Sequence, residues 1–173
     1  PLQLEIAPTK FMFNFAISNN IKKVCIVPEK RKELTTEGGL DLNKNFKFLS
    51  TNIPKLINNG IEVSLFIDPV PANIENVKKL GVKAIEIHTG SYANTQNKKN
   101  DTQLKKIKNI VKIALNNNIS VRAGHGLTFE NVKNIIKISG IEELNIGHFI
   151  IGEAIFYGLE NVILKMIKLM KKK

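Results

Sequence analysis

The sequence contains no tryptophan, only two arginines and a single cysteine. Because Cys25 is alone, no disulfide bond can form within the chain. The cysteine lies in the apolar run Val24-Cys25-Ile26-Val27, where we expect it to be a small buried hydrophobic side chain. A free buried cysteine suits a reducing compartment, so the expected location is the cytoplasm.

Long apolar segments are also missing. No apolar run approaches the roughly 18–20 residues that a membrane-spanning helix needs, so we expect no membrane partner. The first residues, Pro1-Leu2-Gln3-Leu4-Glu5, lack the basic start and the long apolar region of a secretory signal. An initiator methionine is absent too, and we expect the sequence to begin inside a longer polypeptide.

The charge balance is strongly positive, with a formal net charge of +11 at pH 7. Such a balance is typical of nucleic-acid-binding proteins, and a non-catalytic basic binding module is therefore one alternative. However, nearly all of the positive charge comes from lysine, and no aromatic residues alternate with it as a base-stacking surface requires. We interpret the lysines as a solvated surface and expect no nucleic-acid partner.

Short apolar segments alternate with longer amphipathic ones along the chain. Six short segments are rich in valine and isoleucine, which predicts β-strands at Leu2–Ala7, Lys23–Pro28, Glu62–Asp68, Ala84–Thr89, Ser120–Gly124 and Glu143–His148. Apolar residues at helical spacing predict helices at Lys10–Ser18, Phe46–Asn58, Asn73–Leu80, Asp101–Asn116, Phe129–Ile138 and Glu153–Met170. Asp101 and Thr128 are the expected N-caps of two of these helices, and Gly158 is a point where the last one could break.

Strict alternation of strands and helices predicts an α/β fold with a parallel sheet, either open or closed into a barrel. No Gly-x-Gly-x-x-Gly motif follows a strand, which argues against dinucleotide binding. No linker or repeat interrupts the pattern, so residues 1–173 are predicted to form a single domain. The longest loops, Glu29–Asn43 and Gly90–Asn100, follow strands and should lie on the active-site face.

Side chains alternate across a strand, and this alternation predicts which polar residues face the inside of a barrel. Glu5 shares an inward face with Gln3, Glu86 shares one with His88, and Arg122 has the same parity. A buried carboxylate is costly unless it is paired or hydrogen-bonded. Two interpretations of Glu86 remain open, a structural ion pair with Arg122 or a general acid or base tuned by its surroundings.

All three histidines, His88, His125 and His148, fall at the predicted carboxyl ends of strands. No helix carries a His-Glu-x-x-His motif and no cysteine joins the histidines, so we expect no metal. Glycines flank two of them, in Gly124-His125-Gly126 and in Gly147-His148. Glycines at the ends of the last two strands of a barrel let backbone N–H groups approach a phosphate, so we expect phosphorylated substrates.

Six motifs, in order and at near-constant spacing, together resemble the pyridoxine 5′-phosphate synthase family. The first three are Val27-Pro28-Glu29-Lys30-Arg31, Thr35-Thr36-Glu37-Gly38-Gly39-Leu40-Asp41 and Val63-Ser64-Leu65-Phe66-Ile67-Asp68. The others are Ile85-Glu86-Ile87-His88-Thr89-Gly90, Ala123-Gly124-His125-Gly126-Leu127-Thr128 and Leu144-Asn145-Ile146-Gly147-His148. The resemblance implies a cytoplasmic enzyme that condenses 1-deoxy-D-xylulose 5-phosphate with 3-amino-2-oxopropyl phosphate, without a cofactor, and that assembles into homo-octamers built from dimers.

The resemblance also implies roles for individual residues. Glu5 stands at the position of a proton-accepting glutamate, His125 at that of a proton-donating histidine, and Glu86 at that of a glutamate that stabilises the transition state. The remaining matches are substrate-binding or phosphate-binding positions, namely Thr35, Gly126, Gly147 and His148. His88 receives no role, and Arg122 stands where we expect asparagine in a relative.

The fold that the resemblance implies is a (β/α)₈ TIM barrel, of which this sequence carries strands 3–8 and their helices. The family has about 67 further residues before the position of Glu5, and six strands do not close an eight-stranded barrel. One alternative is therefore an inactive fragment. Another is a different phosphate-binding TIM barrel, either an isomerase or an imine-forming aldolase, although neither Lys23 nor Lys83 looks central to the barrel.

Overall fold

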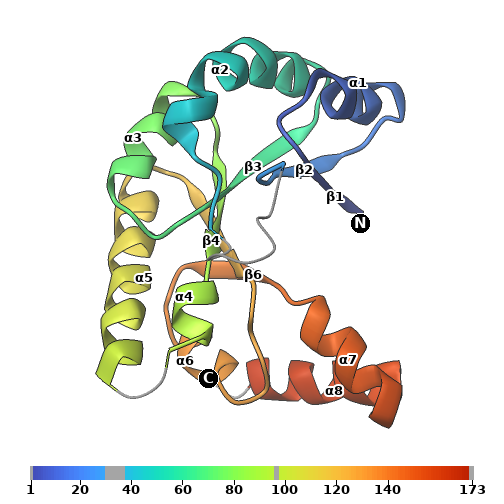
Figure 1. The fold of residues 1–173 in the computed structure, drawn as a ribbon, viewed down its shortest axis with the longest axis vertical. Coiled ribbons are helices and arrows are strands. Elements are labelled where there is room, and N and C mark those ends of the chain that lie inside the picture. Colours follow the sequence, from blue (N-terminus) through green and yellow to red (C-terminus); the bar gives the residue numbers. More distant parts are fainter. Residues whose placement is uncertain (1, 30–37, 96–97, 172–173) are drawn as a thin grey trace.

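The protein is described by a computed structural model that covers residues 2–29, 38–95 and 98–171 (Figure 1). Six parallel strands form one sheet in the order β1-β2-β3-β4-β5-β6. Each strand is thus hydrogen-bonded to its neighbour in sequence. The strands are β1 (Gln3–Ile6), β2 (Lys23–Ile26), β3 (Glu62–Ile67), β4 (Ala84–His88), β5 (Ser120–Gly124) and β6 (Ile141–Asn145).

Helices follow the strands and cover one face of the sheet, which curls into a half-barrel that is open on the other side (Figure 1). This arrangement is that of a TIM-barrel-like α/β fold. The helices are α1 (Lys10–Ser18), α2 (Leu42–Asn58), α3 (Ala72–Lys79), α4 (Gly90–Ala93), α5 (Lys98–Asn116), α6 (Val132–Ile135), α7 (His148–Tyr157) and α8 (Leu159–Met170).

The hydrophobic core lies between the sheet and the helices. Ile85 and Ile87 of β4 are fully buried in it, together with Leu65 of β3 and Val121 of β5. Because side chains alternate along a strand, the residues between them point to the concave face. The alternation predicted for β4 is therefore confirmed, with aliphatic side chains toward the helices and Glu86 away from them.

Register aligns the polar side chains of the concave face in rows across the sheet. Glu86 is paired in register with Phe66 on one side and with Arg122 on the other, and Arg122 is paired with Glu143. Two residues further along each strand, His88 is paired with Gly124, and Gly124 with Asn145. The second row lies at the carboxyl ends of the strands, so these ends carry the site.

Several element boundaries differ from the predictions. Helix α2 begins at Leu42 rather than Phe46, because the Asp41 carboxylate accepts hydrogen bonds from the backbone N–H groups of Asn43 and Lys44, both at 3.0 Å. Asp101 is not an N-cap, since α5 already begins at Lys98. The helix predicted over Phe129–Ile138 is only the four-residue α6.

Thr128 was the expected cap of that helix, and it instead supports the turn before it. Its hydroxyl accepts hydrogen bonds from the backbone N–H groups of Glu130 and Asn131 at 3.2 and 3.4 Å. These hydrogen bonds hold the backbone in a turn at positions where the apolar spacing alone predicts a helix.

The carboxyl-terminal region also departs from prediction. The single helix predicted over Glu153–Met170 is two helices, α7 and α8, separated at Gly158, whose φ of +78° favours glycine. His148 is the first residue of α7 rather than the end of a strand, because β6 already ends at Asn145. Helix α4 was not predicted at all.

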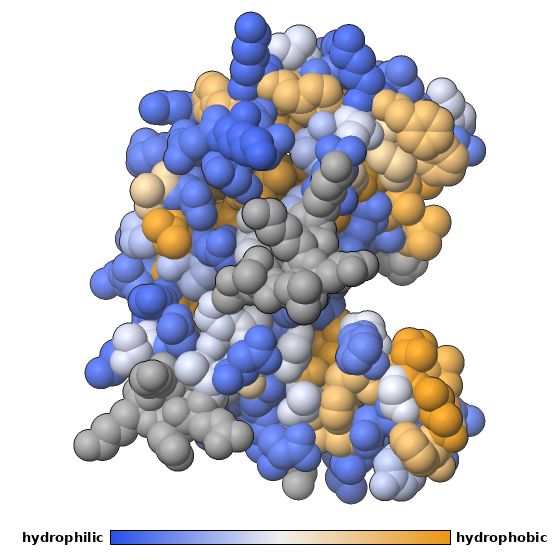
Figure 2. All heavy atoms as spheres, in the orientation of Figure 1, coloured by the Kyte–Doolittle hydropathy of each residue, from blue (hydrophilic) through white to orange (hydrophobic). Residues whose placement is uncertain are grey.

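Apolar side chains gather on the surface of α7 and α8, visible as an orange area in Figure 2. Ile155 and Phe156 are 78% and 79% exposed. The same view shows the molecule hollowed between α1 and the α7–α8 pair. Among the described residues, no helix is both long enough and apolar enough to cross a membrane.

Candidate active site

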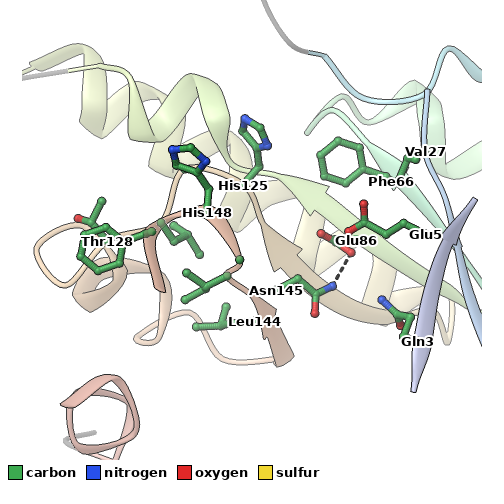
Figure 3. A pocket seen from close by; sticks show the side chains of 15 residues that line it. Gln3, Glu5, Val27, Phe66, Glu86, His125, Thr128, Leu144, Asn145 and His148 are labelled. Carbon is green, nitrogen blue, oxygen red and sulfur yellow. Dashed lines mark hydrogen bonds between the residues drawn. The ribbon is translucent and has the colours of Figure 1, made fainter. Parts of the chain in front are cut away.

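A cavity of about 820 Å³ opens on the concave face, at the carboxyl ends of the strands (Figure 3). Six of the seven predicted site residues line it, from β1, β4, the end of β5 and the start of α7: Glu5, Glu86, His125, Gly126, Gly147 and His148. Thr35, the seventh, lies outside the described residues. The structure therefore brings Glu5 and His148, which lie 143 positions apart in the sequence, to the same cavity.

Two carboxyl groups, those of Glu5 and Glu86, point toward each other across the cavity (Figure 3). Glu5 is exposed, whereas Glu86 is only 3% exposed. Burial raises the pKa of Glu86 above its ordinary value, and the nearby charge of Glu5 raises it further. Hydrogen bonds from Asn145 and Cys25 and the positive charge of Arg122 oppose this shift without cancelling it.

Glu86 is held in place by short polar contacts. The side-chain amide of Asn145 donates to Glu86 Oε2 at 2.5 Å, and the Cys25 thiol donates to the same oxygen at 3.5 Å. Burial, followed by the charge of Glu86, raises the pKa of Cys25, so the thiol keeps its proton and acts as a donor. The expectation that Cys25 is buried is confirmed, and the structure adds this polar contact.

Arg122 does not form the ion pair with Glu86 that strand parity allowed. Its guanidinium instead pairs with Glu62, lies 3.7 Å from Glu143 and donates to Gln3 Oε1 at 2.8 Å. Glu62 and Gln3 are the first residues of their strands. The long arginine side chain therefore runs toward the amino ends of the strands, away from the cavity end where Asn145 binds Glu86.

His125 and His148 lie on the side of the cavity opposite Gln3 (Figure 3). His125 follows the last residue of β5, and His148 opens α7 with Gly147 as its N-cap. Gly147, His148 and Phe149 all line the cavity, so the first turn of α7 faces it. Free backbone N–H groups and the positive end of the helix dipole make such a helix start suited to an anion.

His88 has the inward parity predicted for it, but it does not line the large cavity. Its ring is buried, and Nδ1 lies 2.9 Å from Asp68 Oδ1. The hydrogen bond from His88 is the main reason why the pKa of Asp68 is lowered, so that carboxyl group stays ionised.

Sequence reasoning missed several side chains of the site. Asn145, Phe66 and Thr128 all line the cavity, and so does Gln3, whose inward direction strand parity predicts but to which no role was given. Asn145 carried a usable signal, because it stands two residues before Gly147 in one of the six motifs. In a chain so rich in asparagine, that signal is weak without the contact to Glu86.

The described part of the chain contains no group of three or more histidine, cysteine, aspartate or glutamate side chains that could hold a metal ion. The described lining of the cavity offers carboxyl groups, imidazoles, amides and backbone N–H groups. Such groups transfer protons and bind anions.

Comparison with known proteins matches residues 1–172 to the family model described as "Pyridoxal phosphate biosynthesis protein PdxJ". The chain belongs to this family. The pyridoxine 5′-phosphate synthase of Zymomonas mobilis subsp. mobilis is 49% identical over 170 residues, which cover 98% of this chain and 66% of the relative. That of a Sulfurihydrogenibium species is 48% identical over 166 residues, covering 96% and 68%.

The chain thus spans about two thirds of the length of these PdxJ relatives. Among solved structures, a xylose isomerase domain protein from Planctomyces limnophilus has a TM-score of 0.58 at 12% identity, covering 95% of this chain and 71% of the other. That likeness supports the TIM-barrel-like fold. The family resemblance predicted from the six motifs is confirmed.

Proposed function

We propose that this PdxJ chain belongs to an active pyridoxine 5′-phosphate synthase. The enzyme condenses 1-deoxy-D-xylulose 5-phosphate with 3-amino-2-oxopropyl phosphate and releases pyridoxine 5′-phosphate, inorganic phosphate and water. The observation that carries the proposal is the single cavity in which Glu5, Glu86 and His125 meet the glycine-rich strand ends. Membership of a family whose relatives are named for this activity supports it.

The acid–base roles follow from what the reaction needs. The two substrates form an imine with each other, so no lysine of the enzyme is required, and the later steps are proton transfers, eliminations and ring closure. In this scheme Glu5 accepts a proton, His125 donates one, and Glu86 stabilises the transition state. The exposure of Glu5 to the cavity and the raised pKa of buried Glu86 support different roles for the two carboxyl groups.

Phosphate binding is the second part of the proposal. Gly126, Gly147 and His148 would hold a substrate phosphate at the first turn of α7, and Thr35 would contact substrate. Support comes from the position of Gly147 as N-cap and from the open space beside it, since a Cβ added there would meet no atom of the described residues within 4 Å.

The finer architecture is also proposed. The six strands would be strands 3–8 of a (β/α)₈ barrel, and residues 1–173 would be part of a single domain. The resemblance to the family further implies that the enzyme is a cytoplasmic homo-octamer that needs no cofactor or metal, and we include this in the proposal. The exposed apolar side chains of α7 and α8 are surface of the kind that subunit contacts bury.

The proposal is tested by incubating the complete natural polypeptide with both substrates and detecting pyridoxine 5′-phosphate by mass spectrometry. Product that depends on both substrates supports the synthase. The alternative aldolase predicts a covalent lysine adduct when a carbonyl substrate is trapped with borohydride. A folded enzyme that forms no product but does form that adduct would favour the alternative.

A further inference from the structure

The end of β4 forms a support for the backbone of His125. The backbone N–H of Thr89 donates to the carbonyl oxygen of Gly124 at 2.8 Å. The Thr89 hydroxyl lies 2.7 Å from the same oxygen and 2.6 Å from the carbonyl oxygen of His125. His125 has a φ of +83°, a left-handed conformation that residues other than glycine rarely adopt. The contacts of Thr89 therefore hold an unfavourable backbone conformation in place.

His88 lies directly against the side chain of His125. The two ring centroids are 4.9 Å apart, and Phe66 contacts both rings, with centroids at 5.1 Å from His88 and 6.5 Å from His125. Space around the rings is tight, because a Cβ added to Gly90 would lie 2.5 Å from His88 Nε2 and 3.1 Å from His125 Cδ2. The position of the His125 ring thus depends on that of His88.

Asp68 fixes the orientation and the tautomer of His88. An ionised carboxylate only accepts hydrogen bonds, so the contact of 2.9 Å places a proton on His88 Nδ1. Within the described parts of the chain, His88 Nε2 is a buried atom without a hydrogen-bond partner. The residue His88 lines a second cavity of about 480 Å³, which His125 also lines. The Asp68 carboxylate is thus bonded to an imidazole that lies against the ring of the proposed proton donor, and neither Asp68 nor His88 lines the large cavity.

We propose that Asp68 and His88 are positioning residues for His125, which hold its ring in place and keep a negative charge behind it that favours its protonated form. This inference rests on the proposed function, because it takes His125 as the proton donor. The other titratable side chains that line the two cavities with His125 are Glu5, Glu86 and His148. Among the described side chains, the polar interactions of the Asp68 carboxylate are with His88 and not with these three, so the charge of Asp68 can be removed without breaking a hydrogen bond or ion pair to them.

The test uses two complementary variants of the complete polypeptide. Asp68→Asn removes the charge but keeps an oxygen that can accept from His88 Nδ1. We expect the pKa of His125, measured by NMR titration, to fall by about 0.5–1 unit, because an opposite charge nearby no longer favours the protonated form. A proton donor works only when protonated, so the basic limb of the kcat profile should move to lower pH by the same amount.

His88→Asn keeps a donor toward Asp68 but removes the ring that contacts His125. This variant should lower kcat by about tenfold or more, with little change in the position of the basic limb. Glu75→Gln, at an exposed carboxyl group paired with Lys78, is the matched control and should change neither quantity. Should Asp68→Asn fail to fold, Asp68→Ser removes the same charge and keeps an acceptor.

An unshifted His125 titration and an unshifted basic limb in folded Asp68→Asn would overturn the inference. Wild-type turnover in His88→Asn would overturn it equally. Failure of the proposed function is a separate outcome, seen when the folded wild-type enzyme forms no pyridoxine 5′-phosphate. The NMR titration of His125 does not depend on turnover and distinguishes the two failures.

Discussion

Among the individual residues, Glu86 has a carboxyl group whose pKa is subject to opposing effects. Burial and the charge of Glu5 raise its pKa, while hydrogen bonds from Asn145 and Cys25 lower it. Gly124 leaves little room beside Glu86, since an added Cβ there would lie 2.5 Å from Glu86 Oε1. The protein thus keeps an ionisable group in an environment that disfavours its charged form, as sites of proton transfer commonly do.

The stability of the fold should depend on the ionisation of Glu86. A carboxyl group whose pKa is raised in the folded state contributes most favourably below its unfolded pKa and destabilises the fold as pH rises through the folded value. Glu86→Gln removes the charge and keeps the oxygen that accepts from Asn145. We expect it to increase the free energy of unfolding at pH 7 by on the order of 1 kcal/mol.

Urea unfolding at several pH values measures this effect. The gain over wild type should shrink toward about pH 4, where Glu86 is increasingly protonated in both states. Glu75→Gln, at an exposed carboxyl group, is the control and should show no such trend. A Glu86→Gln variant that is less stable than wild type at pH 7 would contradict the interpretation of Glu86 as a destabilised charge.

For whole strands and helices, the sequence predicts the sheet better than the helix boundaries. The apolar alternation of β4 gave the correct buried face, and β5 has the predicted bounds. Helix α6 is short because Thr128 and Asn131 engage the turn before it, a contact that periodicity does not reveal. Helix α7 has no buried residues in this structure, so its apolar side chains gave no one-sided pattern to identify its start.

The same reasoning explains what could be predicted of the site. Glu5, Glu86 and His125 were found because strand parity and position at a strand end are local properties of the sequence. The true partners of Arg122 could not be found in this way. They depend on the direction of a long side chain, which starts from β5 and reaches Gln3 on β1, Glu62 on β3 and Glu143 on β6.

The close contact between β5 and Glu86 yields a test of the strand arrangement. In Gly124→Ala, the added Cβ would lie 2.5 Å from Glu86 Oε1 and 2.8 Å from the carbonyl oxygen of Asn145. Because a backbone atom cannot yield easily, we expect a loss of about 1–3 kcal/mol in the free energy of unfolding. Turnover should fall as well, since Glu86 must move.

Gly152→Ala is the matched control for this substitution. Gly152 lies within α7, and a Cβ there meets nothing within 4 Å. Alanine favours a helix over glycine, so this variant should be unchanged or more stable by about 0.5–1 kcal/mol. Thermal or urea unfolding of the two variants compares them directly, and equal stability would show that the packing of Glu86 against β5 is looser than the structure has it.

In the whole molecule, the cavity depends on both edges of the half-barrel. Glu5 lies on β1, which is one edge of the six-stranded sheet, and His148 follows β6, which is the other. The open side lies between them, where Figure 2 shows the hollow between α1 and the α7–α8 pair. Residues from opposite edges act together only if the curvature of the sheet is maintained, so the geometry of the site is a property of the complete fold.

The central claim is that this cavity is the site of pyridoxine 5′-phosphate synthesis, with His125 as proton donor. The most direct test compares turnover by the complete wild-type polypeptide and its His125→Asn variant, with both substrates present. The account predicts product from the wild type and a loss of roughly 10²–10⁴-fold in turnover in a variant that unfolds like the wild type. Undiminished turnover in folded His125→Asn would contradict it.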